Sequence, residues 1–174
     1  MMQVTPVPAF TDNYIWLISN TTNQQVAIVD PGDAVPVLAA LERLQMQPVA
    51  ILITHHHRDH VGGIEPLLEA FPGLAVYGPV NENIPHLTHP LGEGDTVALE
   101  ALGLTFSVME LPGHTVGHIV YYGAGSLFCG DTLFANGCGR VFGSTLTDLY
   151  HSLQRIASLP LDTQVYCTHE YTVD

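Results

Sequence analysis

The sequence predicts an α/β protein in which helices cover two β-sheets. The chain has 174 residues, about the length of one domain, and 47% of them are hydrophobic, enough for a buried core. Short apolar runs rich in β-branched residues alternate with segments of helical spacing. The predicted order is strands, helix, strand, helix, several strands, helix and strand. This order favours two covered sheets over one doubly wound sheet.

The N-terminal half contains the strands with the clearest apolar character. Residues 25–29 and 49–54 are apolar almost throughout, as in strands that are buried on both faces. Residues 35–45 have the apolar spacing of a helix, and Asp33 is placed to cap it. We therefore expect strands at 14–19 and 25–29, a helix over 35–45, a strand at 49–54, a helix over 63–71 and a strand at 74–77.

The C-terminal half is predicted to consist of strand pairs followed by one helix. Its glycine-containing turns separate short apolar runs, which is typical of hairpins. Thr145 or Ser144 is expected to cap the helix. The expected elements are strand pairs at 96–99 with 104–111 and at 118–122 with 126–129, a helix over 146–159 and a last strand at 164–168.

The charge balance excludes several classes of partner. The chain has 17 acidic and four basic residues, a net charge of −13, and all four basic residues are arginines. Such a surface repels polyphosphate, so we expect no nucleic-acid partner. It also disfavours anionic membranes. No run of 18 apolar residues is present, and the N-terminus does not have the pattern of a signal peptide, so we expect no membrane span.

Three cysteines, at positions 129, 138 and 167, have no C-x-x-C spacing. An odd number without a signal peptide favours a reducing compartment, and we expect a cytoplasmic protein. Each cysteine is expected to be a small buried residue rather than a nucleophile.

A histidine cluster directly follows the strand at 49–54. It contains His55, His57, Asp59 and His60 within six residues. Alternate side chains of an extended segment share one side, so His55, His57 and Asp59 are expected to converge while His60 approaches differently. Imidazole and carboxylate suit zinc and its first-row neighbours. Four ligands at this spacing fit two adjacent metals better than one tetrahedral ion.

Three further candidate ligands follow later strands. They are His114 after the strand ending near position 111, Asp131 after 126–129, and His169 after the last strand. Rigid scaffolds present functional residues in such loops. Together with the cluster, these residues would complete two metal sites.

The ordered set of seven ligands resembles the metallo-β-lactamase superfamily, and within it glyoxalase II, the hydroxyacylglutathione hydrolases. The motifs that carry this likeness are Phe10-Thr11-Asp12-Asn13-Tyr14, Val29-Asp30-Pro31-Gly32-Asp33, the segments 54–63, 111–118 and 129–134, Gly137-Cys138-Gly139-Arg140, and His169-Glu170-Tyr171-Thr172. The resemblance covers essentially the whole chain. It implies an αββα sandwich, in which two mixed sheets are flanked by helices.

The resemblance also implies roles for the candidate residues. Two divalent metals are implied, zinc first, with iron or manganese in some family members. Catalysis would fall to Asp59, His60 and Asp131, with Asp59 orienting the attacking water. Arg140, Phe142 and Tyr171 would contact glutathione, although Phe142 replaces a tyrosine often found there. The implied ligands are His55, His57 and His114 for one metal, Asp59, His60 and His169 for the other, and Asp131 bridging both.

The implied reaction is the hydrolysis of S-(2-hydroxyacyl)glutathione, such as S-lactoylglutathione, to a 2-hydroxy acid and glutathione, as in methylglyoxal detoxification. We expect a monomer, and a single catalytic domain over residues 1–174 without the family's C-terminal helical domain. Two alternatives stay open. One is a persulfide dioxygenase of the same superfamily, which holds one iron with equivalents of His55, His114 and Asp131. The other is a metal-binding domain with little turnover in isolation.

Overall fold

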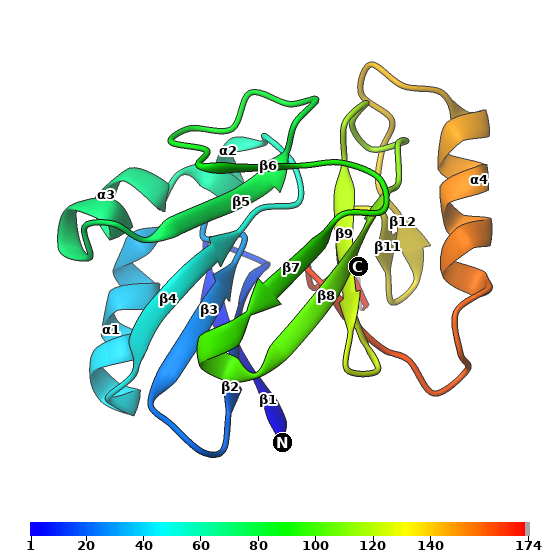
Figure 1. Cartoon of the computed structure of the whole chain (residues 1–174). Coiled ribbons are helices and arrows are strands. Elements are labelled where there is room, and N and C mark those ends of the chain that lie inside the picture. Colours follow the sequence, from blue (N-terminus) through cyan, green and yellow to red (C-terminus); the bar gives the residue numbers. More distant parts are fainter. Residues whose placement is uncertain (173–174) are drawn as a thin grey trace.

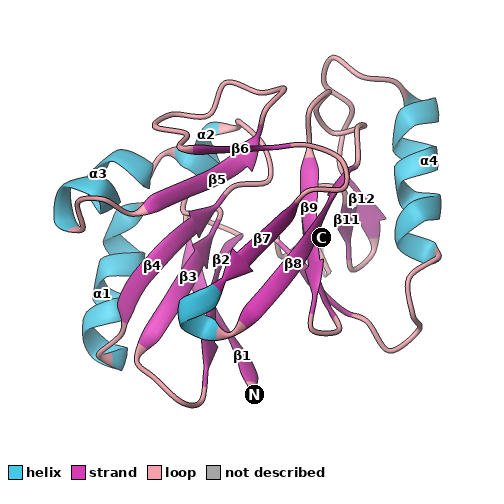
Figure 2. Cartoon of the chain, viewed as in Figure 1, coloured by secondary structure: helices cyan, strands magenta, loops and turns pink. Residues whose placement is uncertain are grey.

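Two β-sheets pack face to face, and helices cover the outer face of each (Figure 1). The structure is a computed structural model that describes residues 1–172. Figure 2 shows the helices on the two outer sides and the strands between them. Helices α1 (Ala34–Leu44) and α3 (Ile64–Ala70) flank the first sheet, and α4 (Leu146–Ala157) flanks the second. The predicted αββα sandwich is confirmed.

The first sheet has six strands in the order β1-β2-β3-β4-β5-β6. The pairs β1–β2 and β2–β3 are antiparallel, whereas β3–β4, β4–β5 and β5–β6 are parallel, so the sheet is mixed. Its strands are β1 (Met2–Ala9), β2 (Asn13–Asn20), β3 (Gln25–Val29), β4 (Gln47–Leu52), β5 (Ala75–Pro79) and β6 (His89–Leu91).

The second sheet has five strands in the order β13-β10-β9-β8-β7, and only the β10–β13 pair is parallel. Its strands are β7 (Thr96–Leu99), β8 (Leu104–Glu110), β9 (Ile119–Gly123), β10 (Ser126–Gly130) and β13 (Gln164–Cys167). Three short pieces connect or extend these elements: helix α2 (Arg58–Val61), the 3-10 turn η1 (Glu100–Leu102), and the small hairpin of β11 (Leu133–Phe134) and β12 (Gly137–Cys138).

Alternation along the central strands divides the core into layers. In β3, Val26 and Ile28 pack against the helices, whereas Ala27 and Val29 face the second sheet. This is the period of two that a strand buried on both faces must have. A third cluster, which includes Leu127 and Ile156, fills the space between the second sheet and α4.

The predicted elements agree with the structure in type, and their ends differ by a few residues. Asp33 caps α1 by accepting a hydrogen bond from the Val35 backbone N–H at 2.9 Å. Of the two residues proposed for α4, Thr145 is its cap, in a capping box with Asp148. The first strand was not predicted, because its two prolines weaken the signal. Proline is tolerated there since β1 lies at the sheet edge.

The direction of the strands brings several chain segments to one edge of the sandwich. β3 and β4 are parallel and end there, and β2, antiparallel to β3, begins there. In the second sheet β8, β10 and β13 run in one direction and also end at a common edge. Loops that leave this edge can therefore meet. No helix within residues 1–172 is long and apolar enough to cross a membrane.

Candidate metal centre

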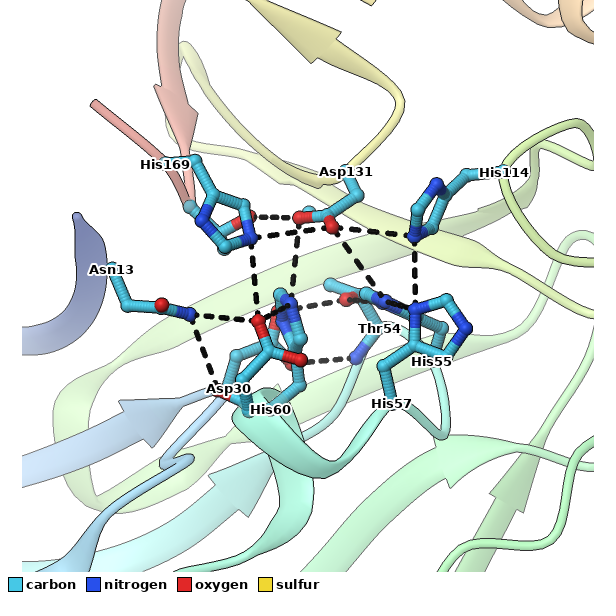
Figure 3. A network of polar contacts seen from close by, with 12 residues as sticks. Asn13, Asp30, Thr54, His55, His57, His60, His114, Asp131 and His169 are labelled. Atoms are coloured by element: carbon cyan, nitrogen blue, oxygen red, sulfur yellow. Dashed lines mark hydrogen bonds and ion pairs between the residues drawn. The ribbon is translucent and has the colours of Figure 1, made fainter. Parts of the chain in front are cut away.

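The seven predicted ligands come together from four loops. Three histidines and Asp59 follow β4, His114 follows β8, Asp131 follows β10 and His169 follows β13. Figure 3 shows the three histidines after β4 pointing toward His114, Asp131 and His169. The sequence prediction that the cluster meets three later residues is therefore realised in the geometry.

The first donor group consists of His55, His57, His114 and Asp131. One ligand atom from each lies within 4.8 Å of the others. The Nδ1 atom of His57 is 3.2 Å from Nε2 of His55 and 3.0 Å from Nε2 of His114. Oδ2 of Asp131 is 3.2 Å from Nε2 of His114 and 3.9 Å from Nε2 of His55.

The second donor group consists of Asp59, His60 and His169. Oδ2 of Asp59 is 3.3 Å from Nε2 of His60 and 3.4 Å from Nε2 of His169. Asp131 faces this group as well, with Oδ1 3.4 Å from Nε2 of His60 and Oδ2 3.3 Å from Nε2 of His169. The Asp131 carboxylate therefore lies between the two donor groups.

Helix α2 gives Asp59 a different direction from the one predicted. His57 is extended (φ −61°, ψ 144°) and caps the helix, so the extended segment ends there. Asp59 and His60 are helical, and consecutive helical side chains point about 100° apart. The expectation that Asp59 lines one side with His55 and His57 is wrong. The helix turns Asp59 toward His60 and His169 instead.

Each histidine of the second group is oriented by a carboxylate. His60 Nδ1 donates to Asp30 at 3.1 Å, and His169 Nδ1 donates to Asp12 at 2.7 Å. Such a partner fixes the tautomer and leaves Nε2 free to bind a metal. Asp30 is fully buried and also accepts hydrogen bonds from the Thr54 backbone N–H and hydroxyl, at 2.8 and 2.7 Å.

Neutral groups support the first donor group. His114 Nδ1 donates to the backbone carbonyl of Arg140 at 2.8 Å. His55 Nδ1 lies 3.0 Å from the hydroxyl of Thr54. Carboxylates thus stand behind the second group, and a carbonyl and a hydroxyl stand behind the first.

Neutral hydrogen-bonding groups also hold the two carboxylates of the centre, Asp59 and Asp131. Asn13 Nδ2 donates to Asp59 Oδ2 at 3.0 Å. The Thr168 hydroxyl donates to Asp131 Oδ1, and the Asp131 backbone N–H donates to Nε2 of His118 at 3.2 Å. Asn13 and Thr168 were not predicted as supporting residues. The only signal in the sequence is that they also stand where strands begin or end.

Burial and the nearby carboxylates give the histidines opposite proton affinities. Burial lowers the pKa of His55, His57 and His114, and it lowers that of His118 to about 3. Burial also opposes charge on His169, yet hydrogen bonds to Asp131 and Asp59 raise its pKa to about 10.

The carboxylates respond to the same contacts. Burial alone would raise the pKa of Asp131, but His60 and His169 hold it well below its usual range. Burial opposes ionisation of Asp59 too, and hydrogen bonds to His169 and His60 overcome that effect and lower its pKa. Both carboxylates are therefore ionised at neutral pH.

The donor chemistry of both groups fits divalent metal ions. Nε2 of His60 is buried and has no hydrogen-bond partner, although it faces two carboxylates. A tetrahedral site with metal–nitrogen bonds of 2.0–2.1 Å has donor atoms about 3.3 Å apart. Most of the separations given above, from 3.0 to 3.4 Å, are close to that value. A metal in each group would also satisfy the buried nitrogen atoms.

A cavity of about 580 Å³ opens onto the centre, and the three predicted substrate contacts line it: Arg140, Phe142 and Tyr171. The Tyr171 ring stacks on His169, with centroids 5.0 Å apart and planes 4° apart. Phe142 meets the rings of His57 and His114 edge to face, each at 5.4 Å. Arg140 is the basic side chain among the residues of this lining.

Backbone packing at Gly139 joins this cavity to the centre. A Cβ atom at Gly139 would lie 2.0 Å from the carbonyl oxygen of Asp131 and 2.9 Å from Nδ1 of His114. Glycine is therefore required where the loop that carries Arg140 passes the donors.

Cys138, just before Gly139, is exposed, so the prediction that each cysteine is buried is wrong for this residue. Cys129 is buried as expected, and Cys167 is partly buried.

Comparison with known proteins identifies the class that this fold and site define. Residues 9–169 match the family model described as the metallo-beta-lactamase superfamily. The chain belongs to the metallo-beta-lactamase superfamily. Its structure is similar to that of the BLEG-1 B3 metallo-beta-lactamase (28% identity, TM-score 0.85), with 98% of this chain and 92% of that chain covered. It is equally similar to ETHE1 from Myxococcus xanthus (28% identity, TM-score 0.85), with 100% and 77% covered.

Curated relatives narrow the likeness to one group of enzymes. The chain is 57% identical to the hydroxyacylglutathione hydrolase of Nitrosomonas eutropha over 99% of its length and 67% of the relative's. It is 54% identical to the hydroxyacylglutathione hydrolase of Nitrosomonas europaea over 100% of its length and 65% of the relative's. The chain thus spans about two thirds of the length of these relatives.

Proposed function

We propose that the chain is the catalytic domain of a hydroxyacylglutathione hydrolase that cleaves S-(2-hydroxyacyl)glutathione. One observation carries this: a cavity with a basic side chain opens directly onto two donor groups that share Asp131. The likeness to curated hydroxyacylglutathione hydrolases at 54–57% identity supports the same reaction. The products would be a 2-hydroxy acid and glutathione, and S-lactoylglutathione is the substrate that we expect.

The proposed centre holds two divalent metals, and we propose zinc. Histidine nitrogen and carboxylate oxygen form the usual ligand set for zinc. Iron is the second candidate for the same donors, because the similar structure of TTHA1623 (33% identity, TM-score 0.79, 95% of this chain and 92% of that one covered) was solved in a di-iron-bound form. The proposed ligands are His55, His57 and His114 for one metal and Asp59, His60 and His169 for the other, with Asp131 shared.

Bound divalent metal would lower the pKa of water to about 7 and polarise the thioester carbonyl. Asp59 is suited to orient the attacking water, because it lines the cavity and its side chain is 39% exposed, whereas that of Asp131 is 8% exposed. Asn13 holds the Asp59 carboxylate from behind. Hydrogen bonds from histidine keep the Asp59 pKa low, so Asp59 stays ionised and can orient the attacking water by accepting a hydrogen bond from it.

The leaving group needs no acid from the protein. A thiol has a pKa of about 8.5, so glutathione can depart as thiolate. Arg140 would pair with a carboxylate of glutathione, and the Tyr171 and Phe142 rings would pack against its backbone. With one basic group in the cavity lining, we expect a high KM for the isolated chain.

The first test is hydrolysis of S-lactoylglutathione by the purified chain, before and after chelation. We expect turnover that chelation removes and that added zinc restores. Metal analysis of the same sample should find two ions per chain. Oxygen uptake with one iron per chain would instead identify a dioxygenase. Two bound metals without turnover would identify a metal-binding domain that lacks catalysis on its own.

Two accompanying proposals follow from the sequence alone. We propose that the protein acts in the cytoplasm, because its cysteines show no pattern of disulfide pairing. We also propose that it is a monomer, which size-exclusion chromatography with light scattering would test.

A further inference from the structure

A carboxylate outside both donor groups joins two of the loops that carry them. Glu82 lies between β5 and β6, and its side chain is 3% exposed. Its Oε2 accepts hydrogen bonds from the His56 backbone N–H at 2.6 Å and from His56 Nδ1 at 2.7 Å. Its Oε1 accepts one from the Gly117 backbone N–H at 3.1 Å. The two oxygens therefore hold two separate chain segments.

These segments carry the histidines of the first donor group. His56 stands between His55 and His57 in the loop after β4 of the first sheet. Gly117 is three residues after His114, in the loop between β8 and β9 of the second sheet. Glu82 thus links the two sheets beside the centre.

The same two loops are also in contact at their buried end, where the His55 ring stacks on that of His118 with centroids 4.8 Å apart. The Ile119 backbone N–H donates to the Thr54 carbonyl at 3.0 Å. These contacts lie at one end of the loops and constrain the outer end less. Glu82 supplies contacts at the outer end, and contacts at both ends fix the separation and the angle of the loops.

The packing around Gly117 shows how closely the carboxylate is seated. A Cβ atom at this position would lie 2.6 Å from Cγ of Glu82 and 3.0 Å from the carbonyl oxygen of Asn81. Any side chain there would therefore displace Glu82. The backbone of the second loop can approach the Glu82 carboxylate because residue 117 is glycine.

We propose that Glu82 is a positioning residue for the first donor group and sets the distance between His57 and His114. This inference rests on the proposed metal centre. Nδ1 of His57 and Nε2 of His114 are 3.0 Å apart although they come from different sheets. A metal site tolerates deviations of about 0.2 Å in its ligand distances, so a small movement of either loop matters. Asp30 and Asp12 orient the second group, which Glu82 does not touch.

The test is zinc binding, measured by competition with a chromophoric chelator. In Glu82→Ala we expect one of the two zinc ions to bind about 10–100-fold more weakly, as is typical when an outer support of a metal ligand is lost. The other ion should keep its affinity. Glu82→Gln should lose less, because the amide oxygen still accepts hydrogen bonds. Thermal unfolding of the chelated proteins shows whether each variant is folded.

Matched variants separate the effect of Glu82 from the effects of its neighbours. His56→Ala removes one imidazole contact but keeps the backbone N–H, so its zinc affinity should stay within a few-fold of the original. Gly117→Ala should weaken the same ion as Glu82→Ala, because its Cβ displaces Glu82. In the double variant the two effects should not add, since the truncated residue 82 no longer has the Cγ atom that the new methyl group would strike.

The possible failures are distinguishable. If the unaltered chain binds no zinc, the proposed metal centre is wrong. If that chain binds two ions and Glu82→Ala binds both equally tightly, the role of Glu82 is wrong. Equal weakening of both ions, together with a lower melting temperature of the chelated protein, would show a general structural role and also overturn the inference. Should Glu82→Ala not fold, Glu82→Gln and Gly117→Ala decide the question.

Discussion

The two donor groups consist of the same types of side chain, histidine and aspartate, but the residues that support the histidines differ. In the first, His55 and His114 are backed by a hydroxyl and a backbone carbonyl, and burial lowers the pKa of both. In the second, Asp30 and Asp12 orient His60 and His169, and the nearby Asp131 carboxylate raises the pKa of both histidines against the effect of burial. An imidazole therefore takes its character from the carboxylates around it as much as from its burial.

This difference bears on metal binding. Neutral imidazoles of low pKa offer free electron pairs at neutral pH without losing a proton. The second group must release a proton, but it gathers Asp59, Asp131 and the two supporting carboxylates around one position. A divalent ion is attracted by that negative charge. We expect the second group to bind its ion more tightly at alkaline pH and to lose this advantage on acidification.

The largest effect is expected where the two groups meet. Asp131→Asn keeps the shape of the side chain but removes the charge that both groups share. We expect both zinc ions to be weakened and turnover to fall by more than the roughly 100-fold cost of losing an outer support. Zinc competition and S-lactoylglutathione hydrolysis measure the two effects. Asp162→Asn, an exposed aspartate in the loop before β13, is the control. Unchanged binding of either ion in the Asp131 variant would show that the carboxylate serves one group only.

A smaller effect is expected in the stability of the metal-free protein. His118 has a folded pKa of about 3, below its unfolded value of about 6.5, so stability should fall as pH drops from 6.5 toward 3. His169 has a folded pKa of about 10, so its contribution is complete below pH 6.5 and is lost as pH rises toward 10. A group that takes up or releases one proton on unfolding should change the melting temperature by about 2–5 °C per pH unit, on either side of the pH of maximum stability.

Thermal unfolding of chelated protein from pH 4 to pH 10 measures this profile. We expect a maximum near neutral pH. His169→Gln should reduce the slope on the alkaline side, where His60 still contributes, and change the acid side less. A profile that rises steadily to pH 10 in the unaltered chain would contradict the assignment of opposite proton affinities to the two sides of the centre.

The smallest effect is expected at a carboxylate far from both groups. Glu93 pairs with Arg155 at 2.6 Å, but the two side chains are 50% and 41% exposed. Arg155 lowers the Glu93 pKa, so the pair stabilises above a pH of about 4.5 and loses that effect on acidification. Glu93→Gln should cost less than about 1 kcal/mol in chemical denaturation at pH 7. Zinc affinity should not change, and a loss there would mean that the contrast between buried and exposed carboxylates is wrong.

The sequence predicted the donors better than it predicted their directions. Histidine and aspartate directly after apolar strands were enough to select all seven candidate ligands. The sequence did not show that α2 starts at Arg58, because a four-residue helix has too few positions for an apolar period. Asp59 therefore points to a different group from the one that an extended segment implies.

The residues that support the ligands could not be predicted from the sequence, for a related reason. Asp12 precedes β2 and Asp30 follows β3, and they lie at the same edge only because these strands are antiparallel. Glu82 meets Gly117 across two sheets, although the two residues are 35 positions apart in the chain. Pairings of this kind depend on tertiary packing, which the local pattern of residues does not encode.

The close seating of Gly139 has a consequence for how such a protein can change. That position admits no side chain, since one would press on the Asp131 carbonyl and His114. Some residues beyond it are less constrained: Phe142 is 50% exposed, whereas Gly143 has a φ of 74° that favours glycine. New substrate preferences can accumulate at residues 140–142 and 144 while the donors stay fixed. A mutant library for altered thioester selectivity should therefore leave Gly139 and Gly143 untouched and vary residues 140–142 and 144.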